Sequence, residues 1–336
     1  MKNTERKHPG IATLAITFVL LLSAGCGGKS ADPPKFFDFV TEGKEVYIKG
    51  YKGNSLSPRI PSKIKGKKVV AILAGAFYSR NTGLQLTGVT IPDSVTTIGY
   101  NAFADNQLSS VTIPDSVTSI DGGVFSENQL TSVIIPNGVT KIASNAFADN
   151  QLSSVTIPDS VTSIGGGAFA NNQLTSVSIP DSVTSIGEGA FADNQLSSAT
   201  IPDSVTSIDG NPFENNPLTS ITIGNGITSI GEGAFVNNQL TSVIIGNHVT
   251  YIGKGAFLNN QLTSVTIPNS VTAIGLAAFS RNQLTSVTIG ANVNLGGREN
   301  DWYQSSFNDS FDNFYNSNGK KAGTYTYSNR RWAYRQ

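Results

Sequence analysis

The sequence predicts a β-rich solenoid, because one pattern of 22 residues repeats along most of the chain. The segment 174–195 shows it as LTSVSIPDSVTSIGEGAFADNQ. A phenylalanine recurs at every 22nd residue from Phe103 to Phe279, and apolar residues alternate with polar ones in part of each unit, as in β-strands. A fixed period of this kind is typical of stacked coils, in which each unit buries its apolar face only against its neighbours.

The columns of the repeat separate a buried stripe from a surface. Counted from the leucine that opens each unit, nine full units run over 86–283, and a partial tenth begins at Leu284. Isoleucine occupies position 6 in every unit and position 13 in every full unit, and position 10 is always Val or Ile. Position 4 is mostly Val, position 17 mostly Ala, and position 18 is always Phe. We expect these columns to form the core.

Each unit is expected to hold two short extended segments. Positions 3–6 alternate as a strand, which proline at position 7 ends because it lacks the N–H that a central ladder needs. A Pro-Asp-Ser turn follows, then a second extended segment at positions 9–13 and a tight helical turn at Gly-Ala-Phe. Asparagine at position 21 is present from Asn106 to Asn282, and we expect it to bond backbone groups and the next asparagine in the stack.

The full pattern, LxxVxIPxxVxxIGxxAFxxN, resembles the BspA-like leucine-rich repeats of bacterial surface proteins. The resemblance covers 86–289, more than half of the chain. It implies a right-handed, curved or twisted solenoid with a parallel sheet along one face, and adhesion to proteins of a host or of neighbouring cells. That family often has cysteine near the asparagine column, whereas this chain has a single cysteine. Ten coils at about 4.8 Å each would stack to roughly 50 Å.

The ends of such an array need covers, because open sheet edges invite aggregation. Residues 36–85 are expected to form an N-terminal cap with an atypical first repeat, starting with strands rich in aromatic and β-branched residues. Residues 290–336 are expected to form a C-terminal aromatic cap that ends in a hairpin. The aromatic residues expected to cover the last coil are Trp302, Tyr303, Phe307, Phe311, Phe314 and Tyr315.

The segment 1–25 has the layout of a lipoprotein signal peptide. A basic start precedes an apolar run over 11–22, which is too short to span a bilayer, and small residues lead to Cys26. The segment LSAGC at 22–26 resembles a bacterial lipobox, although Ser23 replaces the usual aliphatic residue. The resemblance implies cleavage after Gly25 and a lipid on Cys26, followed by a flexible tether over 26–35. The alternative is an ordinary signal peptide with an incidental cysteine.

Few residues offer catalytic chemistry. After the signal peptide the chain has one histidine, His248, and only Cys26, so we expect no cofactor and no metal site built on His or Cys. Aspartates recur at position 8 and could serve glycoside hydrolysis or bind calcium, but aspartate also favours such turns. The zero net charge and the low share of charged residues, 14%, do not resemble a nucleic-acid footprint, which needs clustered Lys and Arg, and they predict no binding to nucleic acid.

The surface built by the repeat is a set of hydroxyl columns. Position 3 is almost always Ser, position 5 mostly Thr and position 11 always Thr in the full units, which suits either a solvated strand face or polyvalent binding. Departures from the pattern are better candidates for binding contacts, as are aromatic and basic residues of the C-terminal cap. The candidates are Lys141, His248, Tyr251, Lys254, Tyr325, Tyr327, Arg330, Arg331 and Trp332.

Three functional hypotheses follow from these patterns. The first is a lipid-anchored, non-catalytic protein on the cell surface or outer membrane of a bacterium, which binds host or neighbouring-cell proteins or glycans. The second is an envelope component that self-associates through its ends or faces. The third is a carbohydrate-active enzyme that uses the aspartate rows. Aromatic residues of the cap have an alternative role in covering the last coil.

Overall fold

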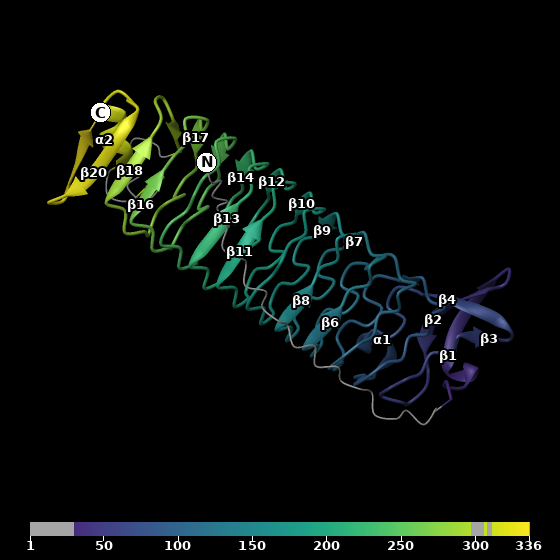
Figure 1. Ribbon diagram of the computed structural model, residues 1–336. Helices are drawn as coiled ribbons and strands as arrows, with labels where there is room; N and C mark the ends of the chain where they lie inside the picture. The colour runs from purple at the N-terminus through teal and green to yellow at the C-terminus, as the bar shows by residue number, and fades with distance from the viewer. Residues whose placement is uncertain (1–29, 297–305, 308–310, 336) are drawn as a thin grey trace, which may run out of the picture. The chain divides into compact units, whose positions relative to one another are not determined.

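The computed structural model describes residues 30–296, 306–307 and 311–335. The chain divides into two compact units, 1–30 and 31–336, and the second unit contains all the elements described below. Within this unit, short coils stack side by side from the N-terminal strands, drawn in purple, to the C-terminal hairpin, drawn in yellow (Figure 1). The predicted β-solenoid is therefore confirmed. The predicted signal peptide and Cys26 lie outside the described residues.

The longest ladder comes from positions 12 and 13 of the repeat. Equivalent residues of successive coils lie opposite each other, as Ser185 does to Ser163, because every unit has the same length. The result is an eight-stranded parallel sheet. Its strands are β7 (Lys141–Ile142), β9 (Ser163–Ile164), β10 (Ser185–Ile186), β12 (Ser207–Ile208), β14 (Ser229–Ile230), β15 (Tyr251–Ile252), β17 (Ala273–Ile274) and β19 (Asn294–Leu295).

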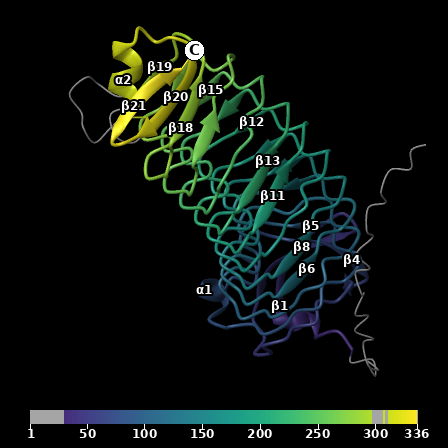
Figure 2. The same ribbon diagram turned by 60° about the vertical axis from the view of Figure 1, so that its left-hand side comes forward.

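Positions 3 to 6 form a second, interrupted ladder on another side of each coil (Figure 2). Its strands pair in parallel, two by two, in the register that the repeat predicts. The predicted strand at these positions is therefore confirmed in these coils, and the parallel surface is two ladders rather than one. The strands are β6 (Ser132–Ile134), β8 (Ser154–Thr156), β11 (Ser198–Ile201), β13 (Ser220–Ile223), β16 (Ser264–Thr266) and β18 (Ser286–Ile289).

The Gly-Ala-Phe segments form hydrogen-bonded turns, not the helical turn that we predicted. The Ala168 N–H donates to the Gly165 carbonyl at 3.2 Å, while the next N–H, that of Phe169, donates to Ala190 of the following coil at 2.8 Å. Bonding between coils therefore replaces continuation of a helix. The residue at position 16 has a left-handed backbone in most coils, as at Gly167 with φ of +62°, and this explains why glycine or asparagine is usual there.

The phenylalanine column is the centre of the core. Ten successive stacked contacts join eleven rings from Phe77 to Phe307, with centroids 4.9–5.9 Å apart and planes within 21° of parallel. The nine rings from Phe103 to Phe279 have no exposed surface. The column continues into the N-terminal cap, where Tyr51 stacks on Phe77 at 5.6 Å. The core is thus one continuous aromatic stack flanked by the isoleucine, valine and leucine columns.

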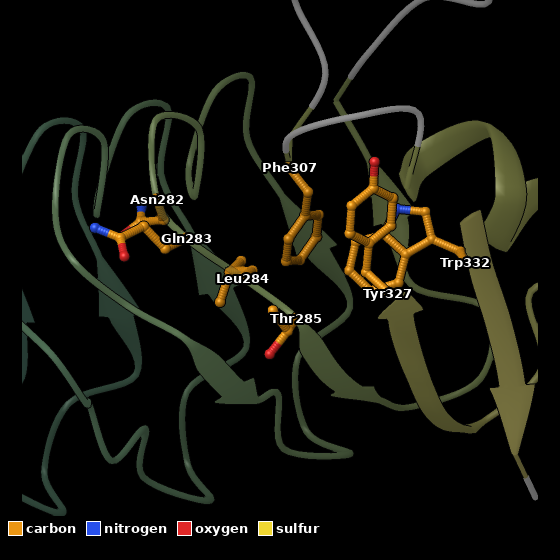
Figure 3. Close-up of a pocket in the computed structure, with 7 residues that line it drawn as sticks. All are labelled: Asn282, Gln283, Leu284, Thr285, Phe307, Tyr327 and Trp332. Carbon is orange, nitrogen blue, oxygen red and sulfur yellow. The ribbon is translucent and has the colours of Figure 1, made fainter. Parts of the chain in front are cut away.

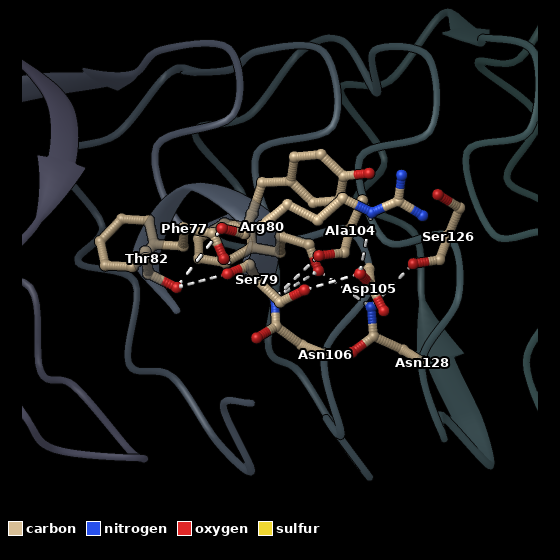
Figure 4. A network of polar contacts seen from close by, with 11 residues as sticks. Phe77, Ser79, Arg80, Thr82, Ala104, Asp105, Asn106, Ser126 and Asn128 are labelled. Carbon is tan, nitrogen blue, oxygen red and sulfur yellow. Dashed lines mark hydrogen bonds and ion pairs between the residues drawn. The ribbon is translucent and has the colours of Figure 1, made fainter. Parts of the chain in front are cut away.

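The buried asparagines at position 21 bond to backbone groups. Asn106 accepts from the Leu86 N–H at 2.8 Å and donates to the Phe103 carbonyl at 3.1 Å. It also donates to the carbonyls of Phe77 and Ala104 at 2.9 and 3.0 Å (Figure 4). The prediction of backbone support is confirmed. The predicted bond to the next asparagine is wrong for this column, because both ends of the amide are already used. Side chains of the exposed position 20 form such a row instead, as between Asn259 and Asn237 at 2.8 Å.

Strands predicted at the N-terminus are present. They are β1 (Phe37–Glu42), β2 (Glu45–Tyr51), β3 (Lys63–Ile64) and β4 (Lys67–Ile72), in the order β1-β2-β4-β3, with β5 (Thr97–Ile98) also beside β4. Short helices η1 (Pro34–Phe36) and α1 (Ser79–Thr82) complete this end. The edge strand β1 has an irregularity at Asp38 and Phe39 and ends in exposed residues, and both features discourage pairing with another chain.

The predicted C-terminal hairpin is also present, as β20 (Gly323–Ser328) and β21 (Arg331–Arg335). β20 pairs antiparallel with β18 and thus closes the second ladder. Helix α2 (Phe311–Ser317) packs beside it, and Phe307 stacks on Phe279 at 4.9 Å. Phe307, Phe311 and Tyr315 are buried, as expected of residues that cover the last coil. Trp302 and Tyr303, which we also expected there, lie outside the described residues.

The C-terminal cap contains a buried carboxylate, and we predict that the cap loses stability as the pH rises. Asp312 accepts from the N–H groups of Ser306 and Phe307 at 2.6 and 3.3 Å, but burial is the larger effect and raises the pKa of Asp312 to about 6. The folded state therefore favours the protonated form of Asp312. The stability that protonated Asp312 contributes is complete below the ordinary carboxyl pKa and is lost as the pH rises through about 6, a change of about 3 kcal/mol.

Hydrogen exchange of the hairpin between pH 4 and pH 7, corrected for the intrinsic exchange rate, measures this dependence. The variant Asp312→Asn cannot ionise, so its cap stability should be flat over the same range. An equal slope in the variant and the parent protein would assign the pH dependence to another group.

Candidate interaction surface

Two coils depart together from the repeat and expose unusual side chains. In the coil 130–151 the threonine of position 5 is replaced by Ile134, which is 79% exposed, and in the coil 240–261 it is replaced by Ile244, which is 83% exposed. The serine usual at position 12 is replaced in the same coils by Lys141 and Tyr251, both exposed. Because the two coils are five repeat units apart, their departures occupy the same columns of the solenoid.

His248 replaces a serine that has a structural function. In other coils this serine donates to a carbonyl of the preceding coil, as Ser204 does to Val183 at 2.6 Å. His248 keeps such a bond, since its Nδ1 lies 2.9 Å from the carbonyl oxygen of Asn225. The imidazole is exposed on the turn. A histidine held to backbone in this way is well explained as a substitute for serine and is not in the geometry of a catalytic triad.

The other departures of the coil 240–261 are exposed as well. Tyr251 lies in β15 between Ser229 and Ala273, and the residue is 43% exposed. Lys254 forms an ion pair with Glu232 of the preceding coil at 3.0 Å, with both side chains largely in solvent, where such pairs contribute little stability. Three of the candidates therefore lie in one coil: His248 is in a turn, Tyr251 is in the strand after it, and Lys254 is in the next turn.

Not all hydroxyl columns are equally free for a partner. The threonines of position 11 donate to the backbone of the preceding coil, as Thr184 does to the Thr162 carbonyl at 3.2 Å. The serines of position 9 are used in the same way, as in Ser182 to Val161 at 2.7 Å. These columns hold the coils together. The exposed hydroxyls of positions 3 and 5 are the better candidates for contacts, and they surround Ile134 and Ile244.

Candidate residues of the C-terminal hairpin differ in their access to solvent. Tyr325 has no exposed surface, because Phe311 and Tyr315 pack against its ring at 5.5 and 5.7 Å. It therefore belongs to the core and offers no contact to a partner. Burial also raises the pKa of Tyr325 to about 12. Arg330 and Arg331 are exposed at the hairpin turn, and Arg330 has a left-handed φ of +61°.

A small pocket lies between the last coil and this hairpin (Figure 3). Its volume is about 220 Å³, and its lining combines aromatic rings with amide and hydroxyl groups. The rings of Tyr327 and Trp332 lie 5.1 Å apart on the hairpin side. The pocket therefore brings together two of the candidates that the sequence suggested. The lining residues are Asn282, Gln283, Leu284, Thr285, Phe307, Tyr327 and Trp332.

The aspartates of position 8 lie on exposed turns. Asp203 accepts from the N–H of Asn225 in the next coil at 2.7 Å, a structural role for the carboxylate. Among the residues that the structure describes, no group of three or more His, Cys, Asp or Glu side chains is arranged to hold a metal ion. Asp203 thus joins its own turn to that of the next coil.

A model of the BspA type leucine rich repeat region matches residues 70–197 and 184–308, in six copies. The two matches together span more than half of the chain. This protein belongs to the BspA type leucine-rich repeat family. Proteins of this family are bacterial surface proteins. Within the described part of the chain, no helix has both the length and the apolar character needed to cross a bilayer.

Solved structures of bacterial proteins have a similar fold. The pneumococcal vaccine antigen PcpA is similar over 79% of this chain and 82% of its own, with 20% identity and a TM-score of 0.55. A leucine-rich repeat protein from Bacteroides ovatus ATCC 8483 is similar over 77% and 64%, with 23% identity and a TM-score of 0.53. These two likenesses show the fold. A search of curated proteins found no match.

The candidates suggested by the sequence did not include Ile134 and Ile244, the two isoleucines of position 5. The signal was present in the sequence, because the two isoleucines share a column and occur in the coils that also change at position 12. The structure adds that these side chains are exposed. Val133 and Ile135, the neighbours of Ile134, are buried, so the strand directs Ile134 outward.

Proposed function

We propose that this protein is a non-catalytic adhesion protein, lipid-anchored through Cys26 at the bacterial surface, and that it binds a protein or glycan partner on its second ladder. The family and the lipobox-like segment support the location. The observation that carries the binding proposal is the pair of exposed isoleucines, Ile134 and Ile244, in one column of an otherwise hydroxyl-rich face.

The arrangement suits a protein partner. Large apolar side chains on a soluble surface are efficient contacts when surrounding groups can exclude water, and the neighbouring threonines and serines are small and uncharged. The isoleucines are five coil-to-coil steps apart, so they lie about 24 Å apart along the stack. A partner that reaches both gains from two weak contacts at once.

We expect the variant Ile134→Thr, Ile244→Thr to bind its partner about 10- to 100-fold more weakly than the parent chain, as for loss of contact hot spots. Threonine is the usual residue of this column, so the free energy of unfolding should change by less than about 0.5 kcal/mol. The partner is found by displaying the protein on beads over arrays of extracellular proteins and glycans, and affinities are then measured by surface plasmon resonance.

Matched controls are Thr156→Ser and Thr266→Ser, one coil along in the same column, which should leave affinity unchanged. Binding to neither array would remove the support for adhesion. Glycan binding that survives in the isoleucine variant but is lost in Tyr327→Ala would place the site in the pocket instead. Hydrolysis of any glycan would contradict the non-catalytic assignment. Mass spectrometry of the membrane-extracted protein tests the lipid on Cys26.

Self-association is the competing function, and the same isoleucines give it a physical basis. Sedimentation at rising concentration distinguishes the two. A monomer at all concentrations would exclude an assembly role, whereas an oligomer that dissociates in the isoleucine variant would assign this face to contact between copies.

A further inference from the structure

Charge is distributed very unevenly along a chain whose net charge is zero. Residues 31–70, in the N-terminal cap, contain nine Lys and Arg against four Asp and Glu, a net charge of +5. Residues 86–289 contain three basic against fourteen acidic residues, a net charge of −11. The described unit therefore has a positive first end followed by a negative array, and fields of this size act beyond individual contacts.

The fold gathers five of these lysines at one edge. Strands β2 and β4 run parallel and begin at the same edge, so the turn before each of them lies there too. Glu45 pairs with Lys68, Lys68 pairs with Lys63, and the Lys68 N–H donates to the Lys44 carbonyl at 3.1 Å. We name this group the lysine edge, which consists of Lys44, Lys63, Lys65, Lys67 and Lys68.

The lysine edge keeps most of its charge uncompensated. Four of its side chains are exposed, and Lys67 is half-buried. The ion pairs found among the described residues involve Lys52, Arg80 and Lys254, none of which belongs to this edge. Glu42 and Glu45 lie nearby, and Glu45 accepts from the Tyr47 hydroxyl at 2.8 Å. Five positive and two negative side chains thus leave a net charge of +3.

The position of this edge in the chain favours a membrane. Asp32 is fixed to the cap, since its carboxylate accepts from the Arg59 N–H at 3.1 Å and its own N–H donates to the Arg59 carbonyl at 2.9 Å. Asp32 is only six positions after Cys26, which limits the reach to about 20 Å. If Cys26 has a lipid, as proposed above, the cap must stay close to the bilayer.

We propose that the lysine edge binds the anionic lipid headgroups of the bilayer in which the protein is anchored. Basic residues next to an anionic surface are attracted to it within about one Debye length, roughly 8 Å at physiological salt. The negative array is repelled by the same surface. The two effects together orient the solenoid with its cap toward the membrane and the Ile134 and Ile244 coils away from it.

The test uses an unlipidated chain that begins at Gly27, which retains the whole compact unit 31–336. We expect it to co-sediment at low salt with phosphatidylcholine vesicles in which about one lipid in three is phosphatidylglycerol. Binding should be at least tenfold weaker at high salt or on pure phosphatidylcholine, because salt screens the attraction. The variant Lys63→Gln, Lys65→Gln, Lys68→Gln should lose about 100-fold in affinity, since each basic residue contributes roughly fivefold.

The control Lys320→Gln, Lys321→Gln, Arg331→Gln removes the same charge from the C-terminal cap and should bind vesicles like the parent chain. Circular dichroism checks that both variants are folded. Absence of vesicle binding by the parent chain, or equal losses in the two variants, would overturn the proposal, as would tight binding to heparin or DNA without binding to vesicles. Because the assay contains neither a lipidated cysteine nor a protein partner, failure of the anchor or of adhesion would not change its result.

Discussion

The variant Asn172→Ala is expected to lose about 3–5 kcal/mol of stability, one of the two largest effects of any single change proposed for this protein. The side chain of Asn172 accepts from the Leu152 N–H at 2.9 Å and donates to the carbonyls of Phe147, Phe169 and Ala170 at 2.9–3.1 Å. Only 7% of the residue is exposed, so alanine leaves buried backbone groups without partners and without water, at about 1–3 kcal/mol each. Urea unfolding measures the loss.

The adjacent Asn171 provides the control. Its side chain is exposed and donates to Asp149 of the preceding coil at 3.0 Å, and its backbone is left-handed with φ of +53°. Asn171→Gly keeps that backbone permissible and should cost less than about 1 kcal/mol. A similar loss in both variants would show that the buried amide has no special role in joining the coils.

The variant Phe169→Ala is expected to cost about 3–5 kcal/mol, the usual range for deleting a buried ring, and to divide the stack in two. Phe169 is fully buried between Phe147 and Phe191, with centroids at 5.6 and 5.5 Å. In a solenoid each coil is stabilised chiefly by its neighbours, so a weak interface in the middle uncouples the halves. Calorimetry should then show two transitions or one broadened transition.

Phe169→Leu is the matched control. Leucine fills most of the space, and we expect a loss of only about 1–1.5 kcal/mol and a single transition. A single sharp transition for Phe169→Ala as well would show that the array unfolds as one cooperative unit despite the gap in its core.

Much of the fold could be predicted because each position of the repeat occurs many times in the sequence, so its preferred residue type is clear. The apolar columns could be predicted from periodicity alone. The cap hairpin could be predicted from a turn between two segments of alternating residues. The eleventh ring was harder to place, because Phe307 does not follow Phe279 at the interval of the repeat. Phe307 joins the stack through contacts that the repeat does not predict, since the Phe279 N–H donates to the Ser306 carbonyl at 2.8 Å.

The candidate site was less predictable, because exposure and hydrogen bonding depend on neighbouring coils. Serine at position 9 and threonine at position 11 resemble free surface hydroxyls in the sequence, but they bond to the preceding coil. Tyr325 and Tyr327 are close in sequence, yet the first is buried and the second lines a pocket that exists only where the hairpin meets the last coil. The lysine edge likewise forms only because the turns before β2 and β4 lie at the same edge of the sheet.

The uniform register between coils has a consequence for how this protein changes length. Interior coils offer their neighbours the same phenylalanine face and similar asparagine bonds, and most of them pair at both positions 12 and 13. Loss or gain of one repeat unit in the gene therefore joins surfaces that already fit each other. The caps stay unchanged while the separation of Ile134 and Ile244 shifts in steps of about 4.8 Å. Gain or loss of repeat units between Ile134 and Ile244 would therefore change the distance between these two contacts while the fold stays the same.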